Sequence, residues 1–573
     1  MAGKITAAKY IAHSLESWGV TEIFFVPTIL SVALAEMDKG TSIRRILTHS
    51  EKSAAYMADG YARAKRAPGV CMSQVIGTSN LAAGLREPFM SKTPVVALTG
   101  APTATTANRN TYQQIDEAKV FDTVTKWRGT IQDVEELPTA LPLAFRQSVS
   151  DTPGPTHLSL PNHVGEIERD LLEHDGEFPS SPISVPEFRA FGDPERIKHA
   201  LNMIASANRP IIVAGGGARV SGASDELITL AEALNIPVAT SINGKDLIPA
   251  THYLHVGTVG MYSRKPANLA LFEADLVIYV GSATGNQVTC NWLLPKKQTP
   301  IIQIDNCAGE IGRHYPNTFG ILGDAKSVLH QFFEAQRATD LPSHKDWLAR
   351  VQTIIGSWRE EVAELLTSEQ IPIRPERLCT ELSRILPSDA LVAVDTGHSG
   401  MWGAGLIDLN HPKQSFIRAA GSLGWGVPAT IGAQFACPER PTVLFTGDGG
   451  FWYHAVEIET AVRWGLNCVF VVNNNCSLNQ EIDIYKSAYG GELTHRHGDL
   501  WKFRDVDFVA MAESMGASGL RVDHPNDIEG ALDKAFKQKG PTVLDVRTEL
   551  HALAPLAEIG GGELLGFTPP PSI

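Results

Sequence analysis

Residues 441–480 decide the fold class of this chain and read PTVLFTGDGGFWYHAVEIETAVRWGLNCVFVVNNNCSLNQ. An apolar run at 443–445 ends in the turn GDGG at 447–450, and a second apolar run at 468–472 ends in three asparagines. Apolar residues recur at helical spacing between them, so the stretch predicts a strand, a glycine turn, a helix and a strand. Short continuous apolar strands on either side of a helix indicate parallel strands buried on both faces.

The ends of these two strands carry residue types that bind phosphate and metal ions. A right-handed crossover places Asp448 and the asparagines at the carboxyl edge of the sheet, where α/β folds bind ligands. Gly449 and Gly450 allow a ligand close to the backbone, and their N–H groups open a helix whose N-terminus favours phosphate. Asp448 and Asn475 provide oxygen ligands of the kind that Mg²⁺ prefers. A glycine turn alone is also compatible with a merely structural tight turn.

The combination of GDG and a following Asn pair at this spacing is more specific, and it resembles the signature of thiamine-diphosphate enzymes. The resemblance implies that Asp448, Asn475 and the backbone carbonyl of Ser477 hold Mg²⁺. Three consecutive asparagines leave Asn474 as the alternative side-chain ligand. Cys476, inside the motif, is interpreted as a packing residue rather than a nucleophile. The residues of this stretch expected at the cofactor are Gly447, Gly449, Gly450 and Asn475.

Composition limits the class of protein. A chain of 573 residues predicts about three domains, and 43% hydrophobic with 20% charged residues is typical of a soluble globular protein. A net charge of −14 gives no support for binding nucleic acid or an anionic membrane, and no apolar run reaches the length of a membrane span. The start of the chain reads as an amphipathic helix rather than a signal peptide. Seven cysteines without CxxC pairs indicate reduced thiols in a cytoplasmic protein.

Residues 1–180 alternate helical and strand patterns, as expected of an α/β domain. A predicted strand at 45–48 ends at His49-Ser50-Glu51 and leads into a helix. Glu51 is therefore expected at the carboxyl edge of a strand and at a helix N-terminus. The alternative interpretation is a carboxylate that the helix dipole stabilises.

The run HSEKSAAYMADGYARAKRAPGV, residues 49–70, is similar to the pyrimidine-binding domain of the acetolactate synthase and pyruvate oxidase superfamily. The resemblance implies that Glu51 hydrogen-bonds N1′ of the aminopyrimidine. The next family block, residues 75–100, has Gly77 and Asn80 in place as cofactor-binding residues, although Ile76 replaces the usual proline. Residues 112–116 resemble a segment whose glutamine faces substrate and cofactor, which assigns that catalytic position to Gln113.

Residues 190–345 predict a second α/β domain, similar to the superfamily's central domain. Relatives carry FAD there in some cases, ADP or CoA in others, and nothing in many. Gly215-Gly216-Gly217 follow a predicted strand and could hold a nucleotide phosphate, or form a purely structural turn. Residues 282–285 read SATG where FAD-binding relatives carry arginine, so FAD is not expected, whereas ADP and CoA remain open.

Residues 370–550 predict the diphosphate- and Mg-binding domain, followed by a tail at 551–573 that could act as a lid. A predicted strand at 390–395 ends in TGHSGMW, and relatives use the equivalent turn to hold the diphosphate. A histidine in such a turn can also be a purely structural group. The block GSLGWGVP at 421–428 resembles the one that places a large aliphatic residue under the cofactor, here Leu423. The cofactor-binding residues expected from these two blocks are Gly397, His398, Ser399, Gly421 and Leu423.

The whole pattern predicts three doubly wound α/β domains with parallel sheets, binding thiamine diphosphate and Mg²⁺. Glu51 and Asp448 lie far apart in the chain yet are expected to meet one cofactor. In relatives they meet across a subunit interface, which implies a homodimer at minimum and a homotetramer as the expected assembly. The substrate is expected to be a small acyl or acyl-CoA molecule.

Substrate class is the least determined property. Thr28 and Tyr112 stand where acetolactate synthases have glycine and phenylalanine, which favours a carbon–carbon lyase of the 2-hydroxyacyl-CoA lyase type. Such an enzyme cleaves a 2-hydroxyacyl compound to an aldehyde or ketone and a formyl product. The alternatives are a decarboxylase and carboligase acting on 2-oxo acids, like acetolactate synthase or benzaldehyde lyase, and a non-catalytic scaffold.

A lyase needs a second acid–base residue in addition to Glu51. Glu492 follows Gly490-Gly491, a hinge that could swing it inward when the loop closes, so we expect it to be that catalytic group. The alternatives to Glu492 are an exposed loop carboxylate without a role, or His495 or His497 in its place.

Overall fold

The computed structural model describes residues 5–101, 106, 109–161, 169–171, 178, 181–337 and 341–554. The chain folds into two compact units. The first comprises Met1–Phe188, Ala420–Glu439 and His454–Cys468, and the second comprises Arg189–Ala419, Arg440–Tyr453 and Val469–Ile573. Two segments from the last third of the chain therefore belong to the first unit. The tail that we expected to act as a lid lies, from residue 555 onward, outside the described residues.

The first unit is built on a six-stranded sheet in the order β3-β2-β4-β5-β7-β6, with parallel pairings throughout. Its strands are β2 (Glu22–Phe25), β3 (Arg44–Leu47), β4 (Gly69–Ser73), β5 (Val95–Ala101), β6 (Trp127–Thr130) and β7 (Thr156–Pro161). A short antiparallel pair, β1 (Ile5–Thr6) and β8 (Asp170–Leu171), lies beside it.

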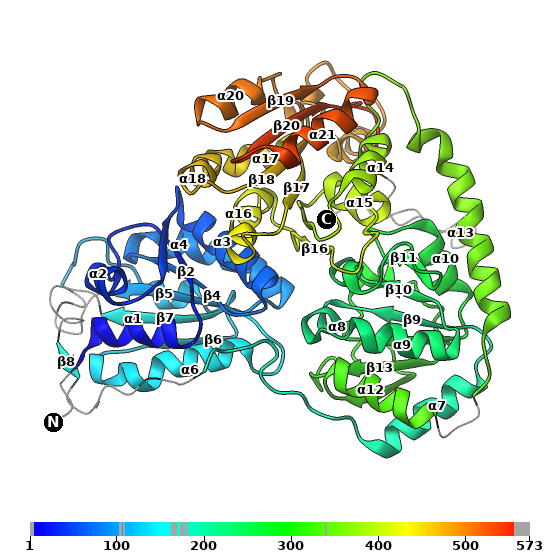
Figure 1. Cartoon of the computed structure of the whole chain (residues 1–573), viewed down its shortest axis with the longest axis horizontal. Helices are drawn as coiled ribbons and strands as arrows, with labels where there is room; N and C mark the ends of the chain where they lie inside the picture. The colour runs from blue at the N-terminus through cyan, green and yellow to red at the C-terminus, as the bar shows by residue number, and fades with distance from the viewer. Residues whose placement is uncertain are drawn as a thin grey trace. The chain divides into compact units, whose positions relative to one another are not determined.

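Helices cover both faces of this sheet (Figure 1). They are α1 (Ala7–Ser17), α2 (Ser31–Gly40), α3 (Glu51–Lys65), α4 (Thr78–Ser91), α5 (Glu117–Val120) and α6 (Leu137–Val149), with 3₁₀ turns η1 (Val75–Gly77) and η2 (Val134–Glu136). Apolar side chains of α1, α2 and α6 pack on one face, against every second residue of the central strands, such as Val70 and Met72. The helix α3 packs on β2, β4 and β5 and on α4.

A helix from the last third of the chain, α16 (Gly426–Ala436), packs directly on α3. A Cβ on Gly60 would lie 2.0 Å from the carbonyl oxygen of Ala429, and one on Gly432 would lie 1.9 Å from that of Met57. The two backbones therefore touch through glycine at both crossing points. The first unit also contains η4 (Ala455–Glu457) and α18 (Ile458–Arg463).

The second unit contains two six-stranded parallel sheets, ordered β11-β10-β9-β12-β13-β14 and β16-β15-β17-β18-β20-β19. The strands of the first are β9 (Pro210–Ala214), β10 (Val238–Thr240), β11 (His255–Thr258), β12 (Leu276–Val280), β13 (Ile301–Asp305) and β14 (Thr318–Leu322). Those of the second are β15 (Leu391–Val394), β16 (Ser415–Arg418), β17 (Thr442–Gly447), β18 (Cys468–Asn474), β19 (Ser518–Val522) and β20 (Thr542–Arg547).

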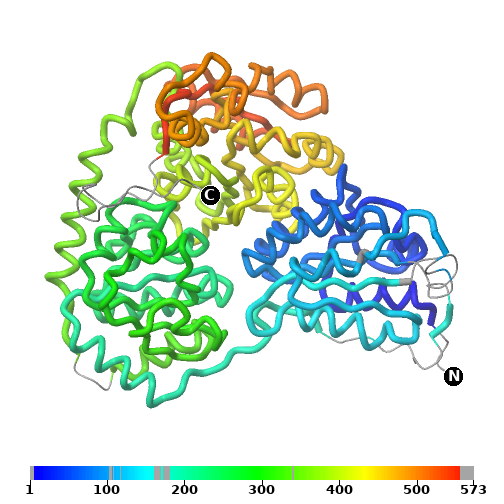
Figure 2. Tube along the Cα trace, turned by 180° about the vertical axis from the view of Figure 1, so that it is seen from behind, coloured from blue at the N-terminus to red at the C-terminus, as the bar shows by residue number. Residues whose placement is uncertain are grey.

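Connecting helices alternate with these strands along the chain, and the Cα trace in Figure 2 follows the alternation from the opposite side. Around the central sheet they are α7 (Pro194–Ser206), α8 (Gly216–Ser221), α9 (Ser224–Leu234), η3 (Ile242–Leu247), α10 (Lys265–Glu273), α11 (Asn286–Thr289), α12 (Ala325–Gln336) and α13 (Lys345–Leu366). Around the last sheet they are α14 (Pro375–Ile385), α15 (His398–Leu406), α17 (Asp448–His454), α19 (Glu481–Ala488), η5 (His497–Leu500), α20 (Phe508–Ser514), η6 (Pro525–Asp527) and α21 (Ile528–Lys537).

Three parallel sheets with helices between their strands confirm the predicted α/β, doubly wound architecture. The first and last sheets share one strand order, whereas the central sheet has the order of a dinucleotide-binding fold. No helix in the described part of the chain is long and apolar enough to cross a membrane.

The single helix predicted between the two strands of the opening stretch is divided into α17, η4 and α18. His454 leaves the helical conformation, with φ −141° and ψ 25°. Its Nδ1–H donates to the carbonyl of Gly424 at 2.8 Å, a long-range contact that helical periodicity alone does not reveal.

The glycine contacts between α3 and α16 predict a specific sensitivity to one methyl group. We expect Gly60→Ala to lower the free energy of unfolding by about 1–3 kcal/mol, because a methyl group there overlaps the backbone of α16. The matched control is Gly356→Ala in α13, where a Cβ meets nothing within 4 Å. Alanine there should stabilise by about 0.5–1 kcal/mol through helix propensity. Thermal midpoints of the two variants check this, and equal midpoints would contradict the close helix contact.

Candidate active site

The carboxyl edge of the last sheet brings two predicted cofactor turns together. Consecutive strands β16 and β17 lie on opposite sides of β15, so the order reverses there, and such switch points bind ligands in open α/β sheets. The turn after β15 contains Gly397, with φ 70°, and His398 and Ser399 at the start of α15. A Cβ on Gly447 at the end of β17 would lie 3.3 Å from Ser399 Oγ. The two turns are therefore neighbours.

Asp448 is a buried carboxylate with one uncompensated oxygen. It opens α17, is 2% exposed, and its Oδ2 has no hydrogen-bond partner among the described residues. Burial raises the pKa of Asp448 to about 7, against the opposing effect of N–H groups including that of Ser477. A buried carboxylate of this kind is unfavourable unless a cation or proton compensates it. The residues present therefore fit a metal ion at this position.

The structure distinguishes the three asparagines that the sequence could not. Asn474 Nδ2 donates to Asp545 Oδ1 at 2.7 Å and its Oδ1 accepts from the N–H of Cys476 at 3.1 Å, so this amide is committed to the protein. Asn475 follows the strand, is half-buried, and accepts from Ser477 Oγ at 2.8 Å. The geometry favours Asn475 over Asn474 as the side-chain ligand. Asn473, the third residue of the register that the sequence left open, has a buried Oδ1 without a partner in the described structure.

Ser477 was predicted to contribute its backbone carbonyl. It forms an isolated antiparallel bridge with Lys502. The two hydrogen bonds of that bridge use the carbonyl of Cys476 and the N–H of Leu478, at 2.8 Å each, and not the carbonyl of Ser477. The bridge fixes this segment while the Ser477 carbonyl takes no part in the pairing.

Packing explains the glycines of the GDGG turn. A Cβ on Gly449 would lie 2.4 Å from Leu478 Cδ2, and one on Gly450 would lie 2.7 Å from Thr446 Oγ1. A Cβ at either position would require a neighbouring side chain to move even without a ligand, which supports the tight-turn interpretation alongside the cofactor interpretation.

His398 is held in one tautomer by a residue that sequence reasoning missed. Asn479 Nδ2 donates to the carbonyls of Leu550 and Ala552, at 2.9 and 3.2 Å, so Oδ1 is the atom that faces His398 Nδ1 at 2.8 Å. Nδ1 must therefore carry the proton. Burial lowers the pKa of His398 below its ordinary value, which leaves Nε2 unprotonated in the neutral ring. No local motif identified Asn479, because its partners lie 71 to 81 residues away.

Three predicted residues of the pyrimidine side lie together in the first unit. Glu51 is the first residue of α3, after the N-cap Ser50. Asn80 Nδ2 donates to Glu51 Oε2 at 3.1 Å, and a Cβ on Gly77 would lie 2.4 Å from Glu51 Oε1. Gly77 is therefore required for the approach of the carboxylate. Gln113 lies in another turn with φ 64° and makes no described hydrogen bond to this group.

The segment before α16 carries Gly421 and Leu423, and buried carboxylates of the first unit hold it. The N–H groups of Ala420 and Ser422 donate to Glu87 in α4. Trp425 Nε1 donates to Asp59 in α3 at 2.7 Å. Sequence reasoning missed both acids, because they belong to different helices far from the segment in sequence.

The predicted second acid–base residue, Glu492, is exposed. It follows Gly490 and Gly491, with φ 66° and 88°, and α19 precedes this turn. His495 is exposed, and His497 Nδ1 lies 3.0 Å from the carbonyl of Thr494 within the same loop. The structure does not bring Glu492 into contact with the other predicted site residues, so its role stays a prediction that requires loop closure.

The triple glycine of the central sheet is also explained by packing. The N–H groups of Gly215 and Gly217 donate to the carbonyls of Val280 and Gly281, at 2.8 and 2.9 Å. A Cβ on Gly215 would lie 2.3 Å from the Gly281 oxygen. Two of the N–H groups that a nucleotide phosphate would use are thus bonded within the protein, which gives ADP or CoA no support.

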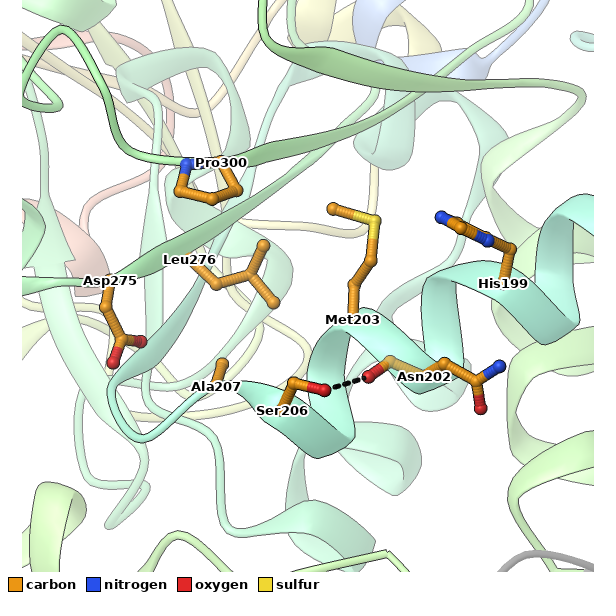
Figure 3. Close-up of a pocket in the computed structure, with 8 residues that line it drawn as sticks. All are labelled: His199, Asn202, Met203, Ser206, Ala207, Asp275, Leu276 and Pro300. Carbon is orange, nitrogen blue, oxygen red and sulfur yellow. Dashed lines mark hydrogen bonds between the residues drawn. The ribbon is translucent and has the colours of Figure 1, made fainter.

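A pocket of about 460 Å³ lies elsewhere in the second unit, beside α7 (Figure 3). Its lining residues are His199, Asn202, Met203, Ser206, Ala207, Asp275, Leu276 and Pro300. Asp275 and Pro300 directly precede β12 and β13, so the pocket lies at the amino edge of the central sheet. Ligands of open α/β sheets bind at the carboxyl edge, and none of the predicted site residues lines this pocket.

The fold is that of an α/β protein with three parallel sheets, and the residues predicted to bind the cofactor form two groups, one in each unit. Three family models match the chain: thiamine pyrophosphate enzyme, N-terminal TPP binding domain, at residues 5–120; central domain, at 197–332; and C-terminal TPP binding domain, at 395–546. The chain belongs to the thiamine pyrophosphate enzyme family.

Relatives extend over nearly the whole chain. A probable acetolactate synthase large subunit of Methanocaldococcus jannaschii is 32% identical over 97% of this chain and 94% of its own length. The acetolactate synthase isozyme 3 large subunit of Escherichia coli is 28% identical over 93% of this chain and 92% of its own length. The acetolactate synthase large subunit of Lactococcus lactis subsp. lactis is 25% identical over 94% of this chain and 92% of its own length. These names favour the alternative of an acetolactate synthase-like enzyme over the 2-hydroxyacyl-CoA lyase that Thr28 and Tyr112 led us to expect.

The uncompensated oxygen of Asp448 predicts dependence on a metal ion. We expect Asp448→Ala to weaken Mg²⁺-dependent binding of thiamine diphosphate by about 100-fold or more, because it removes the one charged group of the predicted ligand set. Titration calorimetry with and without Mg²⁺ measures this. The matched control, Asp533→Ala, removes an exposed carboxylate of α21 in the same unit and should bind like the parent. Parental affinity in Asp448→Ala would reject the metal site.

Proposed function

We propose that this protein is a thiamine-diphosphate- and Mg²⁺-dependent carboligase of the acetolactate synthase type. It decarboxylates one 2-oxo acid and joins the remaining acyl group to a second. The observation that carries the proposal is similarity to an acetolactate synthase over 97% of the chain, together with the matches to both TPP binding domains. With pyruvate as the 2-oxo acid, two pyruvate ions and one proton give acetolactate and carbon dioxide.

Each group of residues has a distinct part in this proposal. Asp448, Asn475 and the Ser477 carbonyl hold Mg²⁺, and the turns at 397–399 and 447–450 bind the diphosphate. When bound, thiamine diphosphate would supply a nucleophilic thiazolium carbon and a cationic ring that can accept the electrons of a broken carbon–carbon bond. Glu51 holds and exchanges a proton with N1′ of the pyrimidine, and its hydrogen bond from Asn80 keeps the carboxylate oriented. Leu423 is the large aliphatic residue that lies under the cofactor and fixes its orientation.

The positions of Glu51 and Leu423 support a homodimer as the minimal active form. Asp59, which binds Trp425, lies eight residues after Glu51 on α3, or about 12 Å along the helix axis. Glu87, which binds the backbone of 420 and 422, lies near the C-terminal end of α4, whose first turn carries Asn80. Glu51 and the Leu423 segment thus lie at opposite ends of the same helix pair. Two copies would each supply one half of a site, and a homotetramer would pair two such dimers.

The first experiment tests substrate class. We expect purified protein with thiamine diphosphate and Mg²⁺ to convert pyruvate to acetolactate and carbon dioxide, followed by colorimetric detection of acetolactate and by carbon dioxide release. Asp448→Ala is the inactive control. The preparation should lack flavin absorbance, because residues 282–285 depart from the FAD-binding pattern. Cofactor binding without turnover of any 2-oxo acid or 2-hydroxyacyl compound would favour a non-catalytic scaffold.

Cleavage of 2-hydroxyacyl compounds, including CoA thioesters, is the second candidate function, and Thr28 is the observation that favours it. This β-branched residue has φ 78°, a conformation that glycine adopts without strain. Acetolactate synthases have glycine there, so threonine adds a β-branched side chain to the turn at a cost in backbone strain. In the same assay, release of a formyl product from a 2-hydroxyacyl substrate, with no reaction of pyruvate, would support this candidate. Glu492→Gln would then be the next variant to test.

The second experiment tests whether two chains build one site. Glu51→Gln and Asp448→Ala should each lose most turnover, the former by about 100-fold with cofactor still bound. Co-expression of the two variants with different tags, and purification on both tags, isolates mixed dimers. If each site combines Glu51 of one copy with Asp448 of the other, a mixed dimer contains one intact site and regains turnover. Mixed dimers as inactive as either variant alone would reject the shared site.

A further inference from the structure

Hydrogen bonds hold the connection between β16 and α16 at residues 420, 422, 424 and 425. The N–H of Ala420 and the N–H of Ser422, the latter at 3.0 Å, donate to the two carboxylate oxygens of Glu87. Gly424 accepts from His454 Nδ1–H at 2.8 Å, and Trp425 donates to Asp59. Gly421 and Leu423, which alternate with these residues, make none of these contacts. We call residues 420–425 the wedge segment.

Glu87 and Asp59 share one arginine. Both carboxylates are fully buried. Arg63 donates to Asp59 at 2.9 and 2.6 Å, lies 3.7 Å from Glu87 Oε1, and stacks over the Trp425 ring with its guanidinium carbon 4.6 Å from the ring centre. Two negative charges and one positive charge leave a net negative charge in the interior. Burial raises the pKa of Asp59 above its ordinary value, which reflects the unfavourable environment of that charge.

The backbone of the wedge segment compensates the remaining charge. Hydrogen bonds from N–H groups to a buried carboxylate are charge-assisted and stronger than neutral ones. The two hydrogen bonds from the N–H groups of residues 420 and 422 therefore stabilise the Glu87 carboxylate, and the same bonds attach the segment to α4. Hydrogen bonds to α3, α4 and His454 therefore hold the conformation of the segment.

One of the two unheld positions, Gly421, faces open space. Gly421 is exposed, Leu423 is half-buried, and Gly424 and Trp425 are buried. A Cβ on Gly421 would meet nothing within 4 Å among the described atoms, in contrast to Gly60 and Gly432 of the same unit, which packing requires. Packing within the chain thus gives no reason for glycine at 421, whereas a ligand that approaches the backbone there does. If Glu87, Asp59 and Arg63 had only a structural role, the exposed backbone at Gly421 would have no explanation.

We propose that Glu87, together with Asp59 and Arg63, positions the wedge segment so that Gly421 and Leu423 fit thiamine diphosphate. This inference rests on the proposed function, since it assumes that the chain binds this cofactor. Glu87 acts through the backbone of 420 and 422 and touches neither cofactor nor substrate itself. It is a positioning residue, and its loss should affect cofactor affinity before substrate affinity.

Glu87→Gln is the informative variant. The amide keeps the shape of the side chain but offers one acceptor oxygen, so one of the two backbone N–H groups loses its partner. We expect the dissociation constant of thiamine diphosphate, at saturating Mg²⁺, to rise by about 10- to 100-fold. The KM for the 2-oxo acid should stay within about twofold once cofactor is saturating. Titration calorimetry on the full-length protein measures the first quantity and steady-state kinetics the second.

Glu22→Gln is the matched control. Glu22 is a buried carboxylate of the same unit, 2% exposed on β2, and accepts from Arg44 Nε at 2.9 Å. Its loss should lower thermal stability without changing the cofactor dissociation constant. If Glu87→Gln does not fold, Asp59→Asn provides the second test, because it keeps the acceptor for Trp425 but removes the charge that Arg63 neutralises.

The outcomes separate this inference from the proposed function. Parental cofactor affinity in Glu87→Gln, or an equal loss in Glu22→Gln, would overturn the positioning role while the function stands. A parent protein that does not bind thiamine diphosphate would overturn the proposed function itself. Weaker cofactor binding in Glu87→Gln and Asp59→Asn, but not in Glu22→Gln, supports the inference.

Discussion

Direct backbone contact between α3 and α16 is the constraint on which the first unit depends. Gly60 and Gly432 allow the helices to touch where any side chain would collide with a carbonyl. That contact joins a helix from the start of the chain, which begins with Glu51, to one that begins directly after the wedge segment. Because the two helices lie at a fixed separation, the acids of α3 and α4 reach the segment's backbone.

Buried carboxylates have two roles in this protein, and their hydrogen bonds tell them apart. Glu87 has both oxygens bonded by backbone N–H groups, so it fixes the structure around it. Asp448 retains a buried oxygen without a partner among the described residues, and burial raises its pKa to about 7. Compensation from outside the protein is what such a group requires. The same residue type therefore positions a segment in one place and is suited to a cation in the other.

Similarity over the whole chain gives more information on substrate class than two substituted positions. Thr28 and Tyr112 led us to favour a lyase, but the relatives that span the chain are named acetolactate synthases. Thr28 keeps the backbone conformation of a glycine, with φ 78°, and Tyr112 is 86% exposed. A turn can preserve its path when its glycine is replaced, at a cost in strain of about 1–3 kcal/mol. Replacing a residue in such a turn does not by itself define another reaction.

The sequence alone determined the three parallel sheets and the turns at their carboxyl edges, because periodicity and glycine turns are local signals. Glu51, Gly77 and Asn80 were identified from the resemblance to a known family. Only the tertiary structure showed three hydrogen-bonded pairs: Asn474 with Asp545, His398 with Asn479, and the wedge segment with Glu87. Those partners lie 71, 81 and 333 residues apart in the chain. A hydrogen bond between distant segments leaves no periodic trace in either one, so it becomes visible only when the packing of strands and helices brings both together.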